Sequence, residues 1–321
     1  MSLERAVHDV TGREVRRVER VGGGDINDAF RVQFADESFG FVKTRADVAP
    51  GEYAAEAAGL RWLAEPGALR VPEVLGVADD VLVLDWVDEG GRGDPAAFGA
   101  GLAEIHAAGA EQFGAPTRGG GQTRTGEARG GETRGGEART GETRGGETRG
   151  GETRGGEAVA PAPPLRLGSL ALPNEPAPDW PTFYAERRLL PLLAHAGLTR
   201  FGNKAVESVC ARIDELAGPP EPPARLHGDL WSGNVLWGRD GRPWLIDPAA
   251  YGGHREVDLA MLRLFGSPGK AFLSAYEERH PLAPGHEERV ELYQLFPLLV
   301  HAALFGGGYP ASAERVARKY A

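Results

Sequence analysis

The most informative stretch of the chain reads LHGDLWSGNVL at residues 226–236, and LIDP follows it at residues 245–248. Two carboxylates and one amide lie on polar segments between short apolar pieces: Asp229, Asn234 and Asp247. Phosphoryl transfer from a nucleotide needs such a set. One carboxylate orients and deprotonates an acceptor hydroxyl, while an amide and a second carboxylate hold magnesium on the phosphates. An Asx turn would explain any one of these residues, but the spacing of the whole set favours the catalytic interpretation.

Residues near the N-terminus would complement this motif. A glycine-rich turn, formed by Gly22, Gly23, Gly24 and Asp25, lies between two predicted strands, where backbone N–H groups could cover phosphates. Lys43 ends a third strand, and Glu56 lies on the following helix, one turn after Glu52 on the same face. A lysine held by a helical glutamate against nucleotide phosphates is the kinase arrangement. The pattern favours Glu56 as the partner, with Glu52 as the competitor.

Strand-like and helix-like segments divide the chain at about residue 86. Strands are predicted at residues 15–21, 29–34, 39–43, 74–77 and 81–86, with a helix over 52–64 between the third and fourth. Helices are predicted at 95–108, twice between 182 and 217, and over most of 257–320, with short strand-like pieces at 225–226, 235–237 and 244–246. The pattern predicts an α+β protein. Its small β-rich N-lobe, residues 1–86, would bind nucleotide, and its larger, mainly helical C-lobe, residues 87–321, would carry catalysis and substrate binding.

A low-complexity segment interrupts the second part. Residues 124–158 repeat a five-residue unit, Arg–(Thr or Gly)–Gly–Glu–(Thr or Ala), seven times. No aromatic or large aliphatic residue occurs between Arg118 and Glu157, so the segment has too little apolar surface to offset the entropy of ordering it. We expect a disordered, dispensable insertion at about residues 118–160. A tether or an RNA-binding tail is the alternative, but glutamate balances the arginines and no side chain could stack on a base.

Composition excludes several classes of function. The chain has 321 residues and a net charge of −10, which argues against nucleic-acid and anionic-membrane partners because both need a positive surface. Cys210 is the lone cysteine, so a disulfide framework and a cysteine-rich zinc site are excluded. No apolar run approaches the ~18 residues of a membrane span, and the N-terminus does not read as a signal peptide. We therefore expect a cytoplasmic protein.

The sequence resembles the fructosamine (ketosamine) kinases, a branch of the aminoglycoside-phosphotransferase and protein-kinase-like fold. The blocks HGDLWSGN at residues 227–234 and GHREVDLAM at residues 253–261 carry most of the resemblance, which covers nearly all of the chain outside the repeat. It implies a bilobal protein-kinase-like fold with ATP in the cleft. Within that fold, Asp229 would be the catalytic base, Asn234 and Asp247 the Mg²⁺ ligands, and Lys43 with Glu56 the phosphate clamp.

The resemblance also implies roles for neighbouring residues. Asp85, Trp86 and Val87 fall where the interlobe hinge offers backbone groups to adenine, and Asp258 matches a buried helical aspartate that braces the catalytic loop. Trp231, two residues after the proposed base, could stack on a sugar or could be a core residue. His254 and Arg255 could touch substrate, or Arg255 could hold Glu256 or Asp258 structurally.

The resemblance implies a kinase that transfers the γ-phosphoryl group of ATP to the third-carbon hydroxyl of a ketosamine, a fructosamine or ribulosamine. The substrate would be a small glycated amine or a glycated protein lysine, and the product would promote deglycation. Two alternatives stay open: a kinase of another small hydroxyl substrate, such as an aminoglycoside or choline, and a nucleotide-binding pseudokinase scaffold. A pseudokinase normally lacks one of the groups that are intact here: Lys43, Asp229, Asn234 and Asp247.

Overall fold

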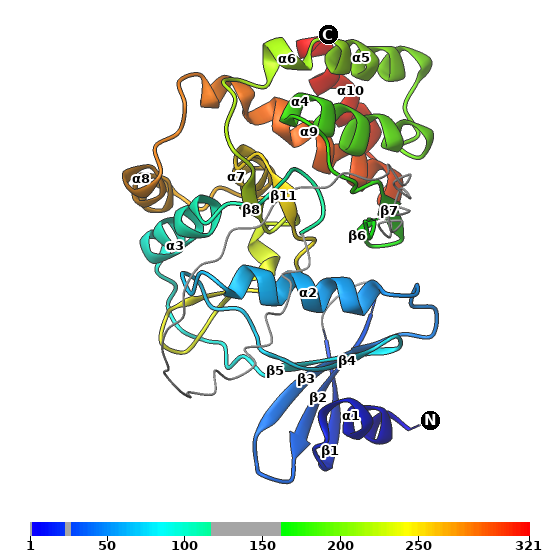
Figure 1. Ribbon diagram of the computed structural model, residues 1–321, viewed down its shortest axis with the longest axis vertical. Helices are drawn as coiled ribbons and strands as arrows, with labels where there is room; N and C mark the ends of the chain where they lie inside the picture. Colours follow the sequence, from blue (N-terminus) through cyan, green and yellow to red (C-terminus); the bar gives the residue numbers. More distant parts are fainter. Residues whose placement is uncertain (1, 23–26, 117–161) are drawn as a thin grey trace, which may run out of the picture. The chain divides into compact units, whose positions relative to one another are not determined.

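The computed structural model describes residues 2–22, 27–116 and 162–321, and Figure 1 shows their helices and strands. The N-terminal part forms a five-stranded antiparallel sheet in the order β1-β2-β3-β5-β4. Its strands are β1 (Val15–Val21), β2 (Asp28–Phe34), β3 (Phe39–Thr44), β4 (Val74–Ala78) and β5 (Val81–Asp85). Their bounds agree with the prediction to within a residue, because runs of β-branched and aromatic residues alternate with Gly, Asp and Pro turns.

Two helices cover opposite faces of this sheet. Val81 and Val83 pack with α1 (Leu3–Thr11), whereas Leu82 and Leu84 pack with α2 (Glu52–Ala64), as the two-residue period of a strand requires. Helix α2 was predicted, but α1 was not. The Ser2 side chain accepts a hydrogen bond from the Arg5 amide at the start of α1, and Gly12 ends the helix at φ +69°.

The C-terminal part is mainly helical. Its longer helices are α3 (Pro95–Ala107), α5 (Arg200–Ala211), α7 (Glu256–Leu264), α8 (Lys270–Arg279), α9 (His286–Phe305) and α10 (Tyr309–Tyr320). Helix α3 packs along α8, and α10 packs on both α9 and α5. The largest apolar core lies around α9, where Leu292, Leu295 and Leu299 are fully buried.

The segment 182–217 differs from the two predicted helices. It contains α4 (Trp180–Phe183), a π-helical turn η1 (Tyr184–Leu189), a 3₁₀ turn η2 (Leu190–Ala194), α5, and α6 (Ile213–Leu216). Pro191 removes a backbone donor after the π turn, which prevents a regular α-helix from continuing. Arg188 on that turn is fully buried, and its guanidinium lies 4.1 Å from the ring centre of Tyr251. The departure from regular helix therefore accompanies a buried cation stacked on aromatic rings.

Short antiparallel pairs complete the fold. Strand β8 (Ala224–Leu226) pairs with β11 (Tyr251–Gly253), β9 (Val235–Trp237) with β10 (Pro243–Leu245), and β6 (Leu165–Leu167) with β7 (Leu170–Leu172). The predicted α+β class is confirmed. The division between residues 86 and 87 stays a prediction, and the repeat insertion lies outside the described residues. Within the described ranges, every helix is too short or too polar to cross a membrane.

Candidate active site

A braced loop carries Asp229. It runs from His227 to Asn234, between β8 and β9, and ends in the 3₁₀ turn η3 (Ser232–Asn234). The backbone N–H groups of His227 and Gly228 donate to the two carboxylate oxygens of Asp258, at 2.7 and 2.9 Å. Gly228 has φ +80°, and a Cβ there would lie 1.9 Å from the Ala249 carbonyl oxygen, so only glycine fits this position. The bracing contact predicted for Asp258 is therefore present.

A second layer of contacts holds the brace itself. Asp258 is fully buried, and its Oδ2 lies 3.2 Å from Nε2 of His106, while Nδ1 of His106 lies 2.7 Å from the Tyr276 hydroxyl. If the His106 imidazole donates from Nε2 to the Asp258 carboxylate, its Nδ1 can accept from the Tyr276 hydroxyl. Both ring nitrogens of His106 then have a hydrogen-bond partner. Asp258 of α7, His106 of α3 and Tyr276 of α8 thus form a hydrogen-bonded series beneath the 227–234 loop. The sequence assigned no role to His106.

Replacing Asp258 by Asn should destabilise the protein and impair catalysis together. The amide keeps one acceptor oxygen but places an NH₂ group opposite a backbone donor, so one buried N–H loses its partner. We expect a loss of about 1–3 kcal/mol in unfolding free energy. Thermal unfolding and kcat measured side by side test this, with exposed Asp214→Asn as the matched control. A variant with unchanged unfolding temperature and kcat would refute the bracing role.

Asp229 and Asn234 are joined within the loop. The Asn234 side-chain amide donates to the Asp229 carbonyl at 2.8 Å and to its Oδ2 at 3.3 Å. Burial and the negative charge of Asp247 raise the pKa of Asp229 to about 6, while the hydrogen bond from Asn234 acts in the opposite direction. A carboxylate with a pKa near 6 suits a general base, because it is mostly ionised at neutral pH yet more basic than an exposed aspartate.

Asp247 connects this loop to the N-terminal sheet. It follows β10, and it has φ +55°, a left-handed conformation that few non-glycine residues adopt. The preceding carbonyl of Ile246 lies 2.9 Å from Nε2 of His227, which holds the start of the segment in place. Oδ1 of Asp247 accepts a 2.7 Å hydrogen bond from Lys43 Nζ. Uncommon backbone geometry held from several sides is typical of functional sites.

Lys43 bridges two carboxylates. Its Nζ also donates to Glu56 Oε1 at 2.7 Å, and Lys43 is only 5% exposed. Burial alone would lower the pKa of Lys43, but the two carboxylates raise it above its ordinary value and keep the ammonium charged. The competing residue Glu52 is instead bound to Arg45, at 2.8 Å. The predicted choice of Glu56 over Glu52 matches these contacts.

Three alanine variants test whether Glu56 or Glu52 is the functional partner of Lys43. Lys43→Ala removes a charged donor to phosphates, and charge-assisted hydrogen bonds contribute about 1.5–3 kcal/mol, so kcat/KM for ATP should fall ~10–100-fold. Glu56→Ala should act in the same direction by a smaller factor, because it positions Lys43. Glu52→Ala should leave kcat/KM for ATP within about threefold. Steady-state kinetics over ATP concentration measure all three, and a damaging Glu52→Ala beside a neutral Glu56→Ala would contradict the assignment.

The remaining predicted nucleotide residues lie along the sheet. Asp85 ends β5, and Trp86 and Val87 follow it. The backbone amide and carbonyl of Val87 form no hydrogen bond with other residues that the structure describes, so both are available to a base edge. Gly22 ends the described part of the glycine-rich turn, directly after β1. Gly23, Gly24 and Asp25 lie outside the described residues.

Trp231 is on the surface of the loop. It is 39% exposed, and its ring lies over Gly233, where an added Cβ would come within 2.3 Å of it. The alternative of a core tryptophan is therefore wrong. A small hollow beside Asp229 is lined by that residue together with Met261, Phe296 and His301. The Pro297 carbonyl accepts from Nδ1 of His301 at 2.7 Å, which leaves Nε2 as the other polar atom of that ring.

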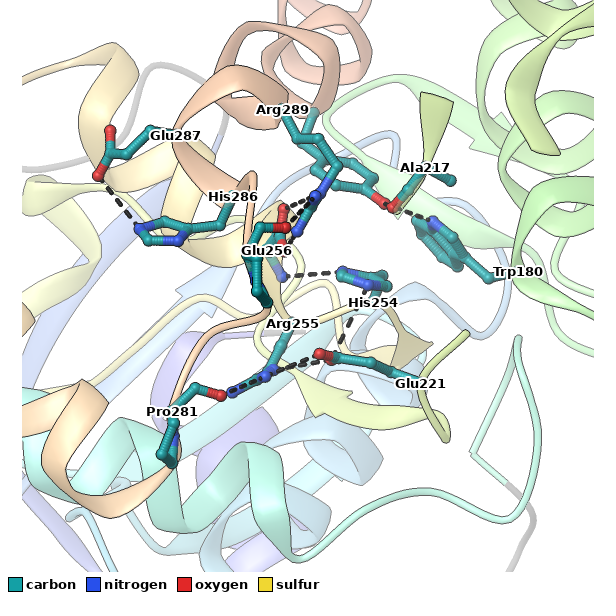
Figure 2. Close-up of polar contacts among 12 residues, drawn as sticks. Trp180, Ala217, Glu221, His254, Arg255, Glu256, Pro281, His286, Glu287 and Arg289 are labelled. Carbon is teal, nitrogen blue, oxygen red and sulfur yellow. Dashed lines mark hydrogen bonds and ion pairs between the residues drawn. The ribbon is translucent and has the colours of Figure 1, made fainter. Parts of the chain in front are cut away.

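His254 and Arg255 are structural in this arrangement, as Figure 2 shows. Each is 3% exposed. Arg255 donates to both carboxylate oxygens of Glu221, at 2.7 and 2.8 Å, and His254 is stacked on Tyr293 with ring centres 5.1 Å apart. The prediction that Arg255 holds Glu256 or Asp258 is wrong in its partner, which is Glu221. The burial of His254 and Arg255 gives their predicted contact with substrate no support. Glu221 lies 34 residues before Arg255, beyond the reach of local spacing.

Comparisons with known proteins place this geometry in a family. The pattern that defines the family described as "Fructosamine kinase" matches residues 1–119 and 165–321. The chain belongs to the fructosamine kinase family. It is 35% identical to the "Probable ketoamine kinase" of Thermus thermophilus, over 89% of this chain and 87% of that protein. It is 31% identical to the chloroplastic protein-ribulosamine 3-kinase of Arabidopsis thaliana, over 96% and 83% of the two chains.

Solved structures agree with this assignment. A crystal structure described as a candidate fructosamine-3-kinase from Thermobifida fusca is 40% identical and has a TM-score of 0.79, covering 99% of this chain and 97% of that one. A choline kinase from Streptococcus pneumoniae shares the fold, with a TM-score of 0.57 at 16% identity over 99% of this chain and 96% of its own. The fructosamine kinase fold is thus that of the kinase-like phosphotransferases, as the sequence predicts.

The repeat segment falls in the gap of the family match, between residues 119 and 165. Replacing residues 118–157 by a short Gly/Ser linker should leave kcat/KM within about threefold, ~0.7 kcal/mol, because the family residues lie on both sides of it. Kinetics of the shortened protein, checked for folding by circular dichroism, measure this. A loss beyond tenfold in a folded protein would assign the repeat a role in activity.

Proposed function

We propose that this protein is an ATP-dependent ketosamine kinase that phosphorylates the third-carbon hydroxyl of a fructosamine or ribulosamine. The observation that carries the proposal is the convergence of five side chains: Lys43 bridges Glu56 and Asp247, and Asp229 lies beside Asn234 on the adjoining loop. Membership of the fructosamine kinase family supplies the substrate class. In this proposal Asp229 is the base, Lys43 and Glu56 clamp the phosphates, and the 85–87 segment receives adenine.

Two oxygen atoms fit a magnesium ion. The side-chain nitrogen of Asn234 donates to Asp229, whereas Oδ1 of Asn234 forms no hydrogen bond with the described residues. Asp247 uses Oδ1 for Lys43, so its Oδ2 remains, on a side chain that is 42% exposed. Magnesium prefers such hard oxygen ligands and usually takes only one or two from the protein, the rest coming from phosphates and water. When bound, the ion would neutralise charge that develops on the transferred phosphoryl group.

The reaction follows from these positions. The acceptor hydroxyl attacks the γ-phosphorus, its O–H proton passes to Asp229, and the bond to the leaving ADP oxygen breaks. Asp229 is buried enough to have a pKa near 6, and Asn234 fixes its carboxylate against the loop. Lys43 provides a permanent positive charge for the phosphates. Most of the rate enhancement would come from orientation and charge neutralisation, as in other phosphoryl transfers.

The acceptor would lie between the exposed ring of Trp231 and the hollow beside Asp229. Aromatic faces pack on sugar C–H surfaces and attract cations, and a glycated amine offers both. The relatives named for ketoamine and ribulosamine kinase activity support this class of substrate. A glycated protein lysine and a small glycated amine present the same sugar, so both are proposed as substrates, and loss of the phosphorylated sugar would free the amine.

A substrate panel tests the proposal. Purified protein with Mg–ATP is assayed for ADP release on glycated lysine, a ribulosamine, an aminoglycoside and choline, with Asp229→Asn as the matched inactive control. We expect turnover on the two ketosamines and phosphate on the third sugar carbon by NMR. Turnover confined to choline or the aminoglycoside would favour the first alternative. Nucleotide binding without turnover on any acceptor would favour a scaffold.

A further inference from the structure

A separate cavity lies between helices α7, α8 and α9. It has a volume of about 110 Å³, and its inner wall is apolar: Leu259, Phe272, Leu273, Leu282 and Val290. Its titratable lining residues are Arg263, Lys270 and His286, which can carry positive charge, and the carboxylate Glu256. None of its lining residues belongs to the hollow beside Asp229. An apolar cavity of ~150 Å³ holds a benzene molecule, so this smaller cavity has room for at most a single ring.

The charges around the cavity are unevenly satisfied. Glu256 accepts two hydrogen bonds from Arg289, at 2.6 and 3.0 Å, and Glu287 accepts two from Arg263, at 2.6 and 2.8 Å. Figure 2 shows the Glu256–Arg289 pair and the contact of His286 with Glu287. Lys270 differs, because it forms no ion pair or hydrogen bond through its side chain within the described ranges. Glu256 and Glu287 are therefore paired, and Glu277 lies 3.6 Å from His286, whereas the exposed Lys270 ammonium has no protein partner within the described ranges.

Helix α7 separates this cavity from the acceptor side of the active site. Glu256, Ala260 and Arg263 line the cavity at helical spacing, while Val257 and Met261 line the hollow beside Asp229. Asp258 on the same helix holds the catalytic loop. The other wall, α8, carries Tyr276, which contacts His106 and through it Asp258. Helix α7 therefore carries the carboxylate that holds the loop of Asp229, and α8 is connected to that carboxylate through His106.

We propose that this cavity binds a small apolar carboxylate, of about the size of benzoate, and that its occupancy changes catalytic turnover. The apolar wall would take the hydrocarbon part, and Lys270 would pair with the carboxylate. A phosphate or a sugar is disfavoured, because the inner wall offers few polar groups. Binding is independent of the proposed function, whereas the effect on turnover rests on it.

Binding is tested with benzoate and its neutral analogue benzyl alcohol, by ligand-observed NMR in the presence of saturating ATP analogue. We expect saturable benzoate binding that is at least fivefold weaker in Lys270→Met, unchanged in Lys204→Met on the remote helix α5, and lost in the cavity-filling variant Leu273→Trp. Benzyl alcohol should bind Lys270→Met and the wild type equally. Equal benzoate affinity in wild type and Lys270→Met, displacement by nucleotide, or no saturable binding would each overturn the site.

Coupling is measured as kcat/KM for a ketosamine with and without saturating benzoate. A ligand that changes the position or mobility of α7 must act through a difference in free energy between two states, and the coupling is reciprocal. We expect at least a threefold change in kcat/KM in wild type and none in Leu273→Trp. Any change in the ketosamine Kd caused by benzoate should be matched by the same change in the benzoate Kd when the ketosamine is bound. If benzoate binds the wild type but kcat/KM stays unchanged, the proposed effect on turnover is wrong, while the proposed binding site stands.

Discussion

Asp229→Asn should bind Mg–ATP as the wild type does and lose most phosphoryl transfer. Asn is nearly isosteric, so the loop keeps its contacts with Asp258, and the side chain can still hydrogen-bond the acceptor hydroxyl. It cannot take the proton, and it removes the negative charge that aligns the nucleophile. Removal of a general base typically costs 10²–10⁴-fold in kcat, about 3–5 kcal/mol. The measurement is single-turnover phosphoryl transfer beside nucleotide affinity from calorimetry.

The control for this variant is Asp80→Asn, which makes the same chemical change on an exposed turn outside the site. It should retain wild-type kinetics. If Asp229→Asn keeps more than about a tenth of wild-type kcat with chemistry rate-limiting, Asp229 is not the base. The base would then have to be another carboxylate that reaches the hollow beside Asp229.

Asp247→Asn should fail for a different reason. The amide oxygen can still accept from Lys43, which now lies 2.7 Å from Oδ1, so the contact between the sheet and the loop can persist. The lost charge weakens the magnesium site, and kcat/KM for Mg–ATP should fall ~10²–10³-fold, about 3–4 kcal/mol. High magnesium should restore part of it. Titration of activity and of Mn²⁺ binding by electron paramagnetic resonance measures both effects.

Magnesium rescue distinguishes the two aspartates. Asp229→Asn should show no rescue, because its defect lies in proton transfer. If both variants respond equally to magnesium, the division of roles between base and metal ligand is wrong. If Asp247→Asn binds Mn²⁺ as tightly as the wild type, the metal must be held elsewhere in the cleft.

Local sequence patterns are sufficient to predict the strands of the N-terminal sheet and the partner of Lys43. Each strand of the N-terminal sheet is a short β-branched or aromatic run between turn residues, so its bounds follow from side-chain chemistry over a few positions. Glu56 could be preferred over Glu52 from helical spacing and from family resemblance, and Arg45 supplies the reason that Glu52 is unavailable. The loop motif at 227–234 places Asp229 and Asn234 five residues apart in one short stretch, so it could be identified without knowledge of distant residues.

Contacts between side chains far apart in the chain could not be predicted from the sequence. The sequence leaves Arg255 open between a structural role and substrate contact. Its partner Glu221 lies 34 residues earlier in the chain, and no local periodicity encodes that pairing. The π turn at Tyr184–Leu189 depends on accommodating the buried Arg188 among rings from other elements, so propensity alone predicts an ordinary helix. The cavity between α7, α8 and α9 is likewise a property of packing, since its apolar residues read individually as core.

The brace at Asp258 has a consequence for how activity is acquired during folding. Its contact with His106 joins residues 152 positions apart, and the contact of His106 with Tyr276 spans 170. Such distant pairs close late, because chain entropy opposes them until nearby structure has formed. The residues of the 227–234 loop are synthesised before α7 and α8, yet the loop lacks its support until Asp258 on α7 and Tyr276 on α8 have reached His106 on α3. Refolding followed by circular dichroism and by activity should therefore show ellipticity returning first and phosphoryl transfer returning afterwards.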